Sequence, residues 1–164
     1  MNNFTENNKN EHSQRKNVQI HNKTAPASFK IFEKIEAGIV LLGSEVKAVR
    51  GGHADLTGSY VKIMESEAYL VNAKIFPYKF SRIEGYDESR TRKLLLHKRE
   101  IIALKSKISQ GNFTLTPLSM YVSNSVIKLE IGLSKGKKQF EKKKLLKEKD
   151  IQRDIERELK EIIR

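Results

Sequence analysis

The sequence contains no cysteine and no tryptophan, and aromatic residues make up only 7% of its 164 residues. Without cysteine the chain can form no disulfide and no thiolate metal site, and it has no thiol nucleophile. The scarcity of aromatic rings also argues against a surface that stacks the bases of a single-stranded nucleic acid, although Phe140 lies within a run of lysines. Hydrophobic packing must therefore hold the fold, and other residue types must carry the function.

Long apolar runs are also missing from the sequence. No stretch approaches the roughly 18 consecutive apolar residues that a transmembrane helix requires. The first residues are rich in asparagine and lack the apolar segment of a secretory signal peptide. We therefore expect a cytoplasmic protein whose N-terminus is not processed.

Motifs of catalysis are absent as well. The sequence has no His-x-x-x-His pair, no Gly-x-x-x-x-Gly-Lys loop for phosphate and no Gly-x-Ser-x-Gly elbow. The four histidines are scattered along the chain, at His12, His21, His53 and His97. We interpret Asp87-Glu88 as a turn, and Glu36 and Glu45 as surface carboxylates. No enzyme, metal or cofactor is expected.

Positive charge is what the sequence has in excess, with a formal net charge of +12. Basicity of this size favours nucleic acid or an anionic membrane surface as the partner. The positive charge is concentrated around the stretch 89–101, where three leucines, Leu94 to Leu96, should be buried while the flanking cations stay hydrated. These cations are Arg90, Arg92, Lys93, Lys98 and Arg99.

Hydrophobic periodicity predicts a mainly β fold. Strands are expected over residues 29–42, 60–64, 68–75, 93–96, 115–122 and 126–133. Helical spacing predicts a short helix over 45–50, capped by Ser44, and a longer one from Lys98 to Gly111. Short antiparallel strands with two or three helices indicate an OB-like antiparallel β-barrel, with a β-sandwich as the alternative.

The two ends of the chain differ in composition from this barrel, which we place over residues 24–134. Residues 1–23 are polar and have little to bury, which predicts a disordered arm. Residues 135–164 form a basic tail with twelve cations and seven anions. Its best apolar stripe, Ile151, Ile155, Leu159 and Ile162, has helical spacing but needs a surface to lie on. We expect this tail to fold on its partner.

Residue chemistry alone thus predicts a basic barrel that binds structured RNA. Two other hypotheses remain open at this point. One is a general ribosome-associated protein of the translation-factor type, and the other is a membrane-surface protein that uses the tail as an amphipathic helix. The acidic residues of the tail argue against the membrane, and they include Asp154, Glu156, Glu158 and Glu161.

Several motifs, in order along the chain, resemble the SmpB family of SsrA-binding proteins. They are Glu36-Ala37-Gly38-Ile39, Gly43-Ser44-Glu45-Val46-Lys47, Arg50-Gly51-Gly52, Tyr60-Val61, the basic and leucine-rich run over residues 90–100, and Ser134-Lys135-Gly136-Lys137-Lys138. The resemblance implies an OB-like, monomeric adaptor in the bacterial cytoplasm. Such an adaptor binds the tRNA-like domain of transfer-messenger RNA and brings it to stalled ribosomes for trans-translation.

The resemblance also implies where RNA is bound. Glu36, Leu95 and His97 match positions on the family's RNA-binding face, beside the cations of the stretch 89–101. The family's tail becomes helical in the messenger channel and decoding centre of the small subunit. The residues implied to contact the ribosome there are Lys135, Lys137, Lys138, Phe140, Lys142 and Lys143.

The chain departs from the family pattern in two places. Residues 22–29 lack the later cations of the family's early basic motif, so the resemblance does not imply RNA contact by that segment. After Phe140, the family's usual Asp-Lys-Arg is replaced by Glu141-Lys142-Lys143. This replacement keeps the charge pattern but loses a guanidinium that could bind phosphate in two places at once.

Overall fold

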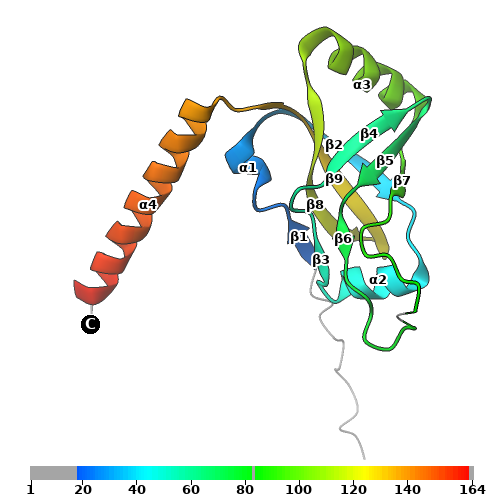
Figure 1. Cartoon of the computed structure of the whole chain (residues 1–164), viewed down its shortest axis with the longest axis horizontal. Coiled ribbons are helices and arrows are strands. Elements are labelled where there is room, and N and C mark those ends of the chain that lie inside the picture. Colours follow the sequence, from blue (N-terminus) through cyan, green and yellow to red (C-terminus); the bar gives the residue numbers. More distant parts are fainter. Residues whose placement is uncertain (1–17, 83, 163–164) are drawn as a thin grey trace, which may run out of the picture.

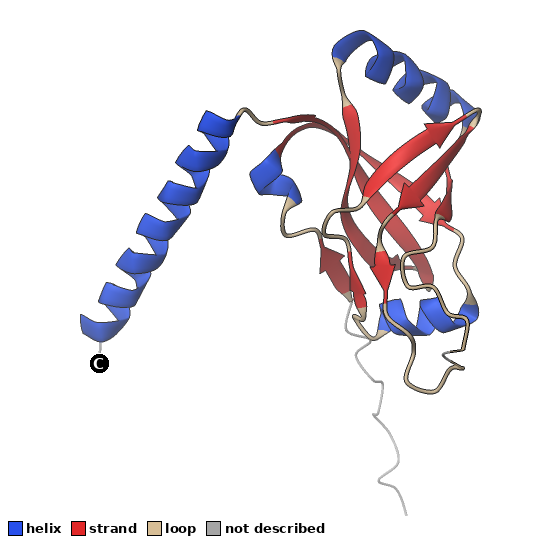
Figure 2. Ribbon diagram, in the orientation of Figure 1, coloured by secondary structure: helices blue, strands red, loops and turns tan. Residues whose placement is uncertain are grey.

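Antiparallel strands form a closed ring in the computed structural model, which describes residues 18–82 and 84–162. The sheet has the order β1-β8-β4-β5-β7-β2-β9, and β8 also pairs with β9, which closes the barrel (Figure 2). Its strands are β1 (Gln19–His21), β2 (Phe29–Ile39), β4 (Tyr60–Met64), β5 (Glu67–Val71), β7 (Arg92–Leu95), β8 (Thr114–Ser123) and β9 (Val126–Gly136). The predicted mainly β, OB-like barrel is therefore confirmed, and closure excludes an open sandwich.

A small second sheet and the helices lie outside this ring. The sheet pairs β3 (Ala54–Asp55) with β6 (Lys74–Ile75). The helices are α1 (Ala25–Ser28), α2 (Gly43–Arg50), α3 (Lys98–Gly111) and α4 (Gln139–Ile162). Figure 1 shows α3 at one end of the barrel and α2 at the other, so each covers an open end.

Alternating side chains build the core, as the sequence predicts. In β9, Ile127, Leu129, Ile131 and Leu133 are all buried, because every second residue of a strand faces the same side of a sheet. The hairpin between β8 and β9 turns at Asn124 and Ser125, both with positive φ. The helix expected from Lys98 to Gly111 is confirmed, and it ends at the left-handed Asn112.

The barrel extends beyond both predicted boundaries. Strand β1 pairs with β8, and the buried side chain of Asn22 donates a hydrogen bond of 2.9 Å to the Pro117 carbonyl. The predicted arm, residues 1–23, therefore includes residues 19–22 that belong to the barrel, and its residues 1–17 lie outside the described part of the chain. At the other end β9 continues to Gly136, and the Lys137 N–H donates to the Ser28 carbonyl over 2.9 Å. Short-range composition could not reveal either of these long-range pairings.

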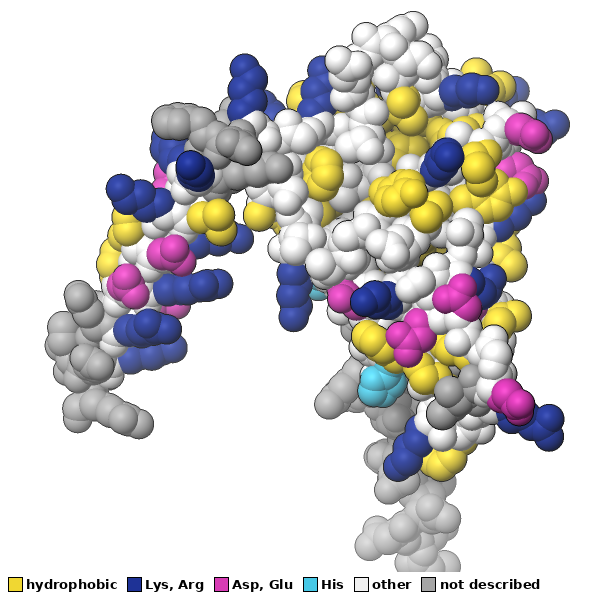
Figure 3. Space-filling model, viewed as in Figure 1, with side chains coloured by type: hydrophobic (Ala, Val, Ile, Leu, Met, Phe, Trp, Pro, Cys, Tyr) yellow, Lys and Arg dark blue, Asp and Glu magenta, His cyan; other side chains and the backbone are white. Residues whose placement is uncertain are grey.

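Helix α4 leaves the barrel at this point and runs outward past α1 (Figure 1). Lysine and arginine side chains are spread along it with acidic side chains between them (Figure 3). Ile151 and Ile155, the two residues of the apolar stripe whose side chains the structure describes, are each at least half exposed, as is Leu146. None of the helices in the described part of the chain combines the length and the apolarity that crossing a membrane requires.

Candidate nucleic-acid interface

An open groove of about 520 Å³ runs along β2 and β7 to the start of α3. Five of the predicted RNA-binding residues line it, namely Glu36, Lys93, Leu95, His97 and Lys98. Arg99 adjoins the groove on the first turn of α3. Strand β7 delivers the leucine and one lysine, β2 delivers the carboxylate, and the helix start delivers the remaining cations. The groove thus gathers residues more than sixty positions apart in the chain.

Close packing of β2 against β7 holds the wall of the groove. Gly38 pairs with Leu95, and a Cβ on Gly38 would lie only 3.2 Å from the Leu95 Cβ. Leu94 points inward and is buried, whereas Leu95 is 55% exposed. The prediction that all three leucines are buried is therefore wrong for Leu95, since strand alternation turns neighbouring side chains to opposite faces. An exposed leucine held on a rigid strand can contact a base or a ribose.

Glu36 is one of three glutamates that line the groove, with Glu67 and Glu100. Its carboxylate accepts hydrogen bonds from the Lys128 ammonium at 2.5 Å and from the Tyr121 hydroxyl. The bond from Lys128, followed by that from Tyr121, holds the pKa of Glu36 below its ordinary value. The same carboxylate raises the pKa of Tyr121 to about 12. Glu36 is therefore ionised over the physiological range and can accept a hydrogen bond from a base amino group.

We predict that Glu36→Gln lowers the pKa of Tyr121 from about 12 toward the ordinary 10. The largest cause of the raised pKa is the hydrogen bond that the Tyr121 hydroxyl donates to this carboxylate; a neutral amide accepts that bond more weakly and carries no negative charge to disfavour the phenolate. Titration of the tyrosine ring signals by NMR measures the change. Tyr69 is the internal control because its hydroxyl donates to Glu67 instead, and an unchanged Tyr121 pKa would contradict the pairing.

The cations of the groove differ in how firmly they are held. Lys93 pairs with Glu67 and Lys128 with Glu36, and all four side chains are at least 32% exposed. Exposed pairs of this kind contribute only about 0–1 kcal/mol, so an incoming phosphate can replace either carboxylate. His97, Lys98 and Arg99 are exposed at the start of α3, where the helix dipole adds partial positive charge. The groove is thus well suited to a phosphate backbone.

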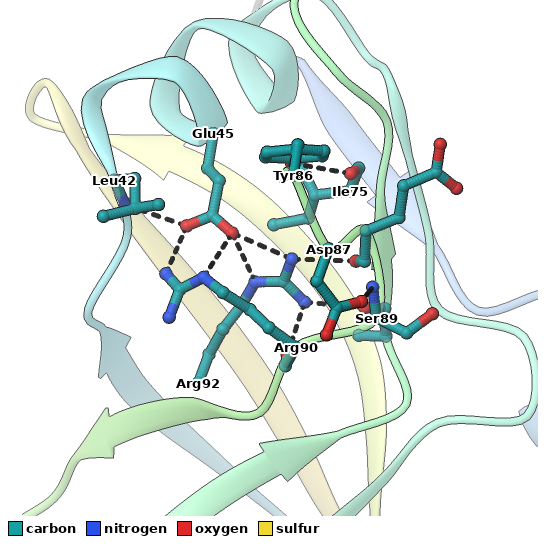
Figure 4. Close-up of polar contacts among 10 residues, drawn as sticks. Leu42, Glu45, Ile75, Tyr86, Asp87, Ser89, Arg90 and Arg92 are labelled. Atoms are coloured by element: carbon teal, nitrogen blue, oxygen red, sulfur yellow. Dashed lines mark hydrogen bonds and ion pairs between the residues drawn. The ribbon is translucent and has the colours of Figure 1, made fainter. Parts of the chain in front are cut away.

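Arg92 and Arg90 do not belong to this groove. Arg92 and Glu45 are both 0% exposed, and they form an ion pair of 2.9 Å inside the barrel (Figure 4). Arg90 closes on the same carboxylate at 2.5 Å, with its side chain 30% exposed. The predictions that Arg92 stays hydrated and that Glu45 is a surface carboxylate are therefore wrong. Strand alternation supplies the reason, because Arg92 shares the inward face of β7 with Leu94.

No buried side-chain nitrogen or oxygen of the described residues, those of this cluster included, lacks a hydrogen-bond partner. Arg92 donates to the carbonyls of Ala73, Glu88 and Arg90 as well as to Glu45. The second oxygen of Glu45 accepts the Leu42 N–H at 2.8 Å, which caps the start of α2. The cluster fastens α2, the start of β7 and the loop before it to one another. A signal was present in the sequence, since Glu45, Ala48 and Val49 share the inward face of α2.

The predicted ribosome-contacting residues fall in two structural settings. Lys135 lies in β9, and the Lys137 ammonium donates to the Pro26 carbonyl at 2.7 Å, so both belong to the barrel. Lys138 and Lys143 are exposed. Phe140 and Lys142 belong to α4, but their side chains lie outside the described residues. The loop at Asp87 is a turn as expected, since its carboxylate accepts the Ser89 N–H at 2.9 Å.

Comparison with known proteins gives concordant matches. The family model described as "SmpB protein" matches residues 19–161. An "SsrA-binding protein" of Sulfurihydrogenibium sp. (strain YO3AOP1) is 48% identical over 143 residues, covering 87% of this chain and 94% of that protein. Its counterpart in Aquifex aeolicus (strain VF5) is 48% identical over 140 residues, covering 85% and 89%. A chain from the solved structure "tmRNA-SmpB: a journey to the center of the bacterial ribosome" superposes with a TM-score of 0.63 at 41% identity, covering 74% of this chain and 86% of that one.

Proposed function

Since the chain belongs to the SmpB family of SsrA-binding proteins, we propose that it is an adaptor that binds the tRNA-like domain of transfer-messenger RNA. It delivers this RNA to ribosomes stalled without a stop codon, which allows trans-translation. The adaptor acts in the cytoplasm as a monomer, and it needs neither a cofactor nor a catalytic activity of its own. The solved structure that it resembles combines the same two partners, transfer-messenger RNA and the ribosome.

The observation that carries this proposal is the groove between β2, β7 and α3. It presents an exposed leucine, an ionised glutamate and a histidine, with cations on both sides. Leu95 contacts the apolar face of a base or ribose, Glu36 accepts from a base edge, and His97 reaches a base or phosphate. Lys93, Lys98 and Arg99 bind phosphates and set the orientation of the RNA. Arg90 and Arg92 are left out because they serve the buried cluster.

The proposal is tested by a gel-shift titration of the full chain against the isolated tRNA-like domain. We expect tight binding that weakens linearly on a logarithmic scale of salt concentration, because bound cations release counterions from the RNA. The comparison is an unrelated folded RNA of equal length. Equal affinity for the two RNAs would overturn the proposal and leave a general RNA-binding protein.

We predict that Leu95→Asp lowers the affinity for the tRNA-like domain by about tenfold or more. A carboxylate at this exposed position repels phosphate and removes an apolar contact, which for a leucine is worth about 1.5–3 kcal/mol when the side chain becomes fully buried. The matched control is Ile102→Asp, the same kind of change at a 69% exposed residue of α3 that does not line the groove. Equal losses in the two variants would show that only net charge matters.

The tail is proposed as the second functional part. Helix α4 exposes Ile151 and Ile155 of the apolar stripe, and it starts beyond Lys137, which contacts the barrel. It enters the empty messenger channel, where Lys138 and Lys143 meet ribosomal RNA together with Phe140 and Lys142. The binding energy comes from the surface that the channel offers to the stripe and from phosphate contacts.

A further inference from the structure

Two phenylalanine rings and two lysines form a compact group on the outside of the barrel. The rings of Phe32 and Phe113 meet edge to face, with centroids 5.2 Å apart and planes at 85°. The Lys135 ammonium lies 4.4 Å from the Phe113 centroid and 5.9 Å from that of Phe32. The Lys30 ammonium lies 5.6 Å from the Phe32 centroid. We call these four residues the aromatic platform.

A β-bulge places Phe32 on this surface. The pairing of β2 with β9 steps from Ile31 opposite Ser134 to Glu33 opposite Leu133, so Phe32 is an extra residue without a partner. A bulge of this kind re-aims the side chain of the extra residue. Phe32 is 53% exposed, although a phenylalanine gains about 1.5–3 kcal/mol when it is buried. The fold therefore holds an aromatic ring in solvent at a rigid position.

The platform is separate from the groove. None of its four residues lines the groove, and on β2 the position of Phe32 precedes Glu36 by four residues, or about 13 Å along an extended strand. It lies instead near the end of the barrel where the tail leaves, because Lys135 is the second-last residue of β9 and α4 begins at Gln139. A ligand on the platform would therefore lie beside the root of the tail.

The chemistry of the platform fits an unpaired nucleotide. An exposed aromatic ring stacks on a base of any sequence. The two ammonium groups over the Phe32 ring, 5.6 and 5.9 Å from its centroid, are on flexible side chains and can shift to the phosphate that each nucleotide carries. An apolar protein surface fits poorly, because it would remove water from both ammonium groups without offering them a partner. The nearby carboxylate of Glu33 is already paired with Lys107, so Glu33 does not neutralise these two lysines.

We propose that the aromatic platform stacks an unpaired nucleotide of small-subunit ribosomal RNA at the place where the tail enters the ribosome. The source is ribosomal, because the groove takes the tRNA-like domain while the platform lies on the side of the tail. This step rests on the proposed function for the tail, and it adds a contact made by the rigid barrel.

The test is the affinity of full-length variants for purified small ribosomal subunits and, separately, for the tRNA-like domain. Phe32→Leu keeps apolar area but removes the π face, whereas Phe32→Tyr keeps the ring. We expect Phe32→Leu to weaken binding to the subunit about tenfold, Phe32→Tyr to bind like the parent, and the tRNA-like domain to bind both equally.

Lys135→Gln should reduce the slope of subunit affinity against salt concentration, both on logarithmic scales, by the amount expected for about one lost phosphate contact. Tyr60→Leu, at another half-exposed aromatic residue, is the matched control, and thermal melting verifies that each variant is folded.

Each possible result decides the matter. Unchanged subunit binding by Phe32→Leu, or a parent chain that does not bind the subunit, overturns the platform. A loss confined to the tRNA-like domain overturns its assignment to ribosomal RNA. If the parent chain fails to bind the tRNA-like domain, while Phe32→Leu still binds the small subunit about tenfold more weakly than the parent, the adaptor function is refuted and the platform is retained.

Discussion

Glu45→Ala is expected to lower the free energy of unfolding by about 3–5 kcal/mol, because it leaves a buried cation without its counter-ion. Arg92 is 0% exposed, and its remaining partners are backbone carbonyls, which cannot neutralise its charge. The start of α2 also loses the bond from the Leu42 N–H to this carboxylate. Urea denaturation followed by circular dichroism measures the change.

Glu33→Ala is the control for that experiment. Glu33 also pairs with a cation, Lys107, but both side chains are more than two-fifths exposed. An exposed pair contributes about 0–1 kcal/mol, so the control should unfold nearly like the parent. If Glu45→Ala were equally mild, water or a rearranged carboxylate would have to reach Arg92, and the rigid cluster of Figure 4 would not exist in solution.

The stabilisation from Glu45 should also depend on pH. Burial, the largest influence, would raise the pKa of Glu45, but the bonds from Arg90, the Leu42 N–H and Arg92 together outweigh burial and hold that pKa below 4.5. A carboxyl group whose pKa is lower in the folded state stabilises the fold above its unfolded pKa and ceases to do so as the pH falls through its folded pKa. The difference in stability between parent and Glu45→Ala should therefore be constant above about pH 4.5 and shrink below it.

Ending the chain after Lys138 is expected to abolish trans-translation and to leave binding of the tRNA-like domain within about twofold of the parent. The groove and the tail are separate parts, and α4 begins only at Gln139. The cut preserves Lys135 in β9 and the two hydrogen bonds by which Lys137 holds α1. A gel shift and a tagging assay on stalled ribosomes measure the two activities.

A second truncation, after Ser134, is the informative comparison. It removes the end of β9 and the contacts of Lys137, so it should also lower the melting temperature. If the chain ending at Lys138 lost both activities together while remaining folded, the division of labour between groove and tail would be wrong. If the chain ending at Lys138 kept tagging activity, the tail would not be required for function on the ribosome.

Periodicity was enough to predict most of the barrel. The inward side chains of β9 and the span of α3 follow from local spacing, which needs no knowledge of the rest of the fold. The first strand was missed because Gln19–His21 is polar and short, and only its pairing with β8 makes it a strand. Such pairings depend on residues about a hundred positions away.

The functional surface was harder to predict than the fold. Charge grouping pointed to the right stretch, yet it could not separate Lys93 on the outside of β7 from Arg92 on the inside. Alternation would have separated them, but a buried arginine becomes plausible only when the buried Glu45 is known. The aromatic platform was missed for a related reason, since a low total of aromatic residues says nothing about two rings that a bulge brings together.

The attachment of the tail sets its geometry. Lys137 is held to α1 through its backbone and side chain, and α4 begins at Gln139, so Lys138 alone forms the joint between them. One residue spans at most about 3.5 Å, which lets the helix pivot but scarcely translate. A helix of 24 residues measures about 36 Å, so a long helix is joined to the barrel through a single residue. Only a channel that is empty along about this length, beginning at the surface of the barrel, could accommodate the whole tail.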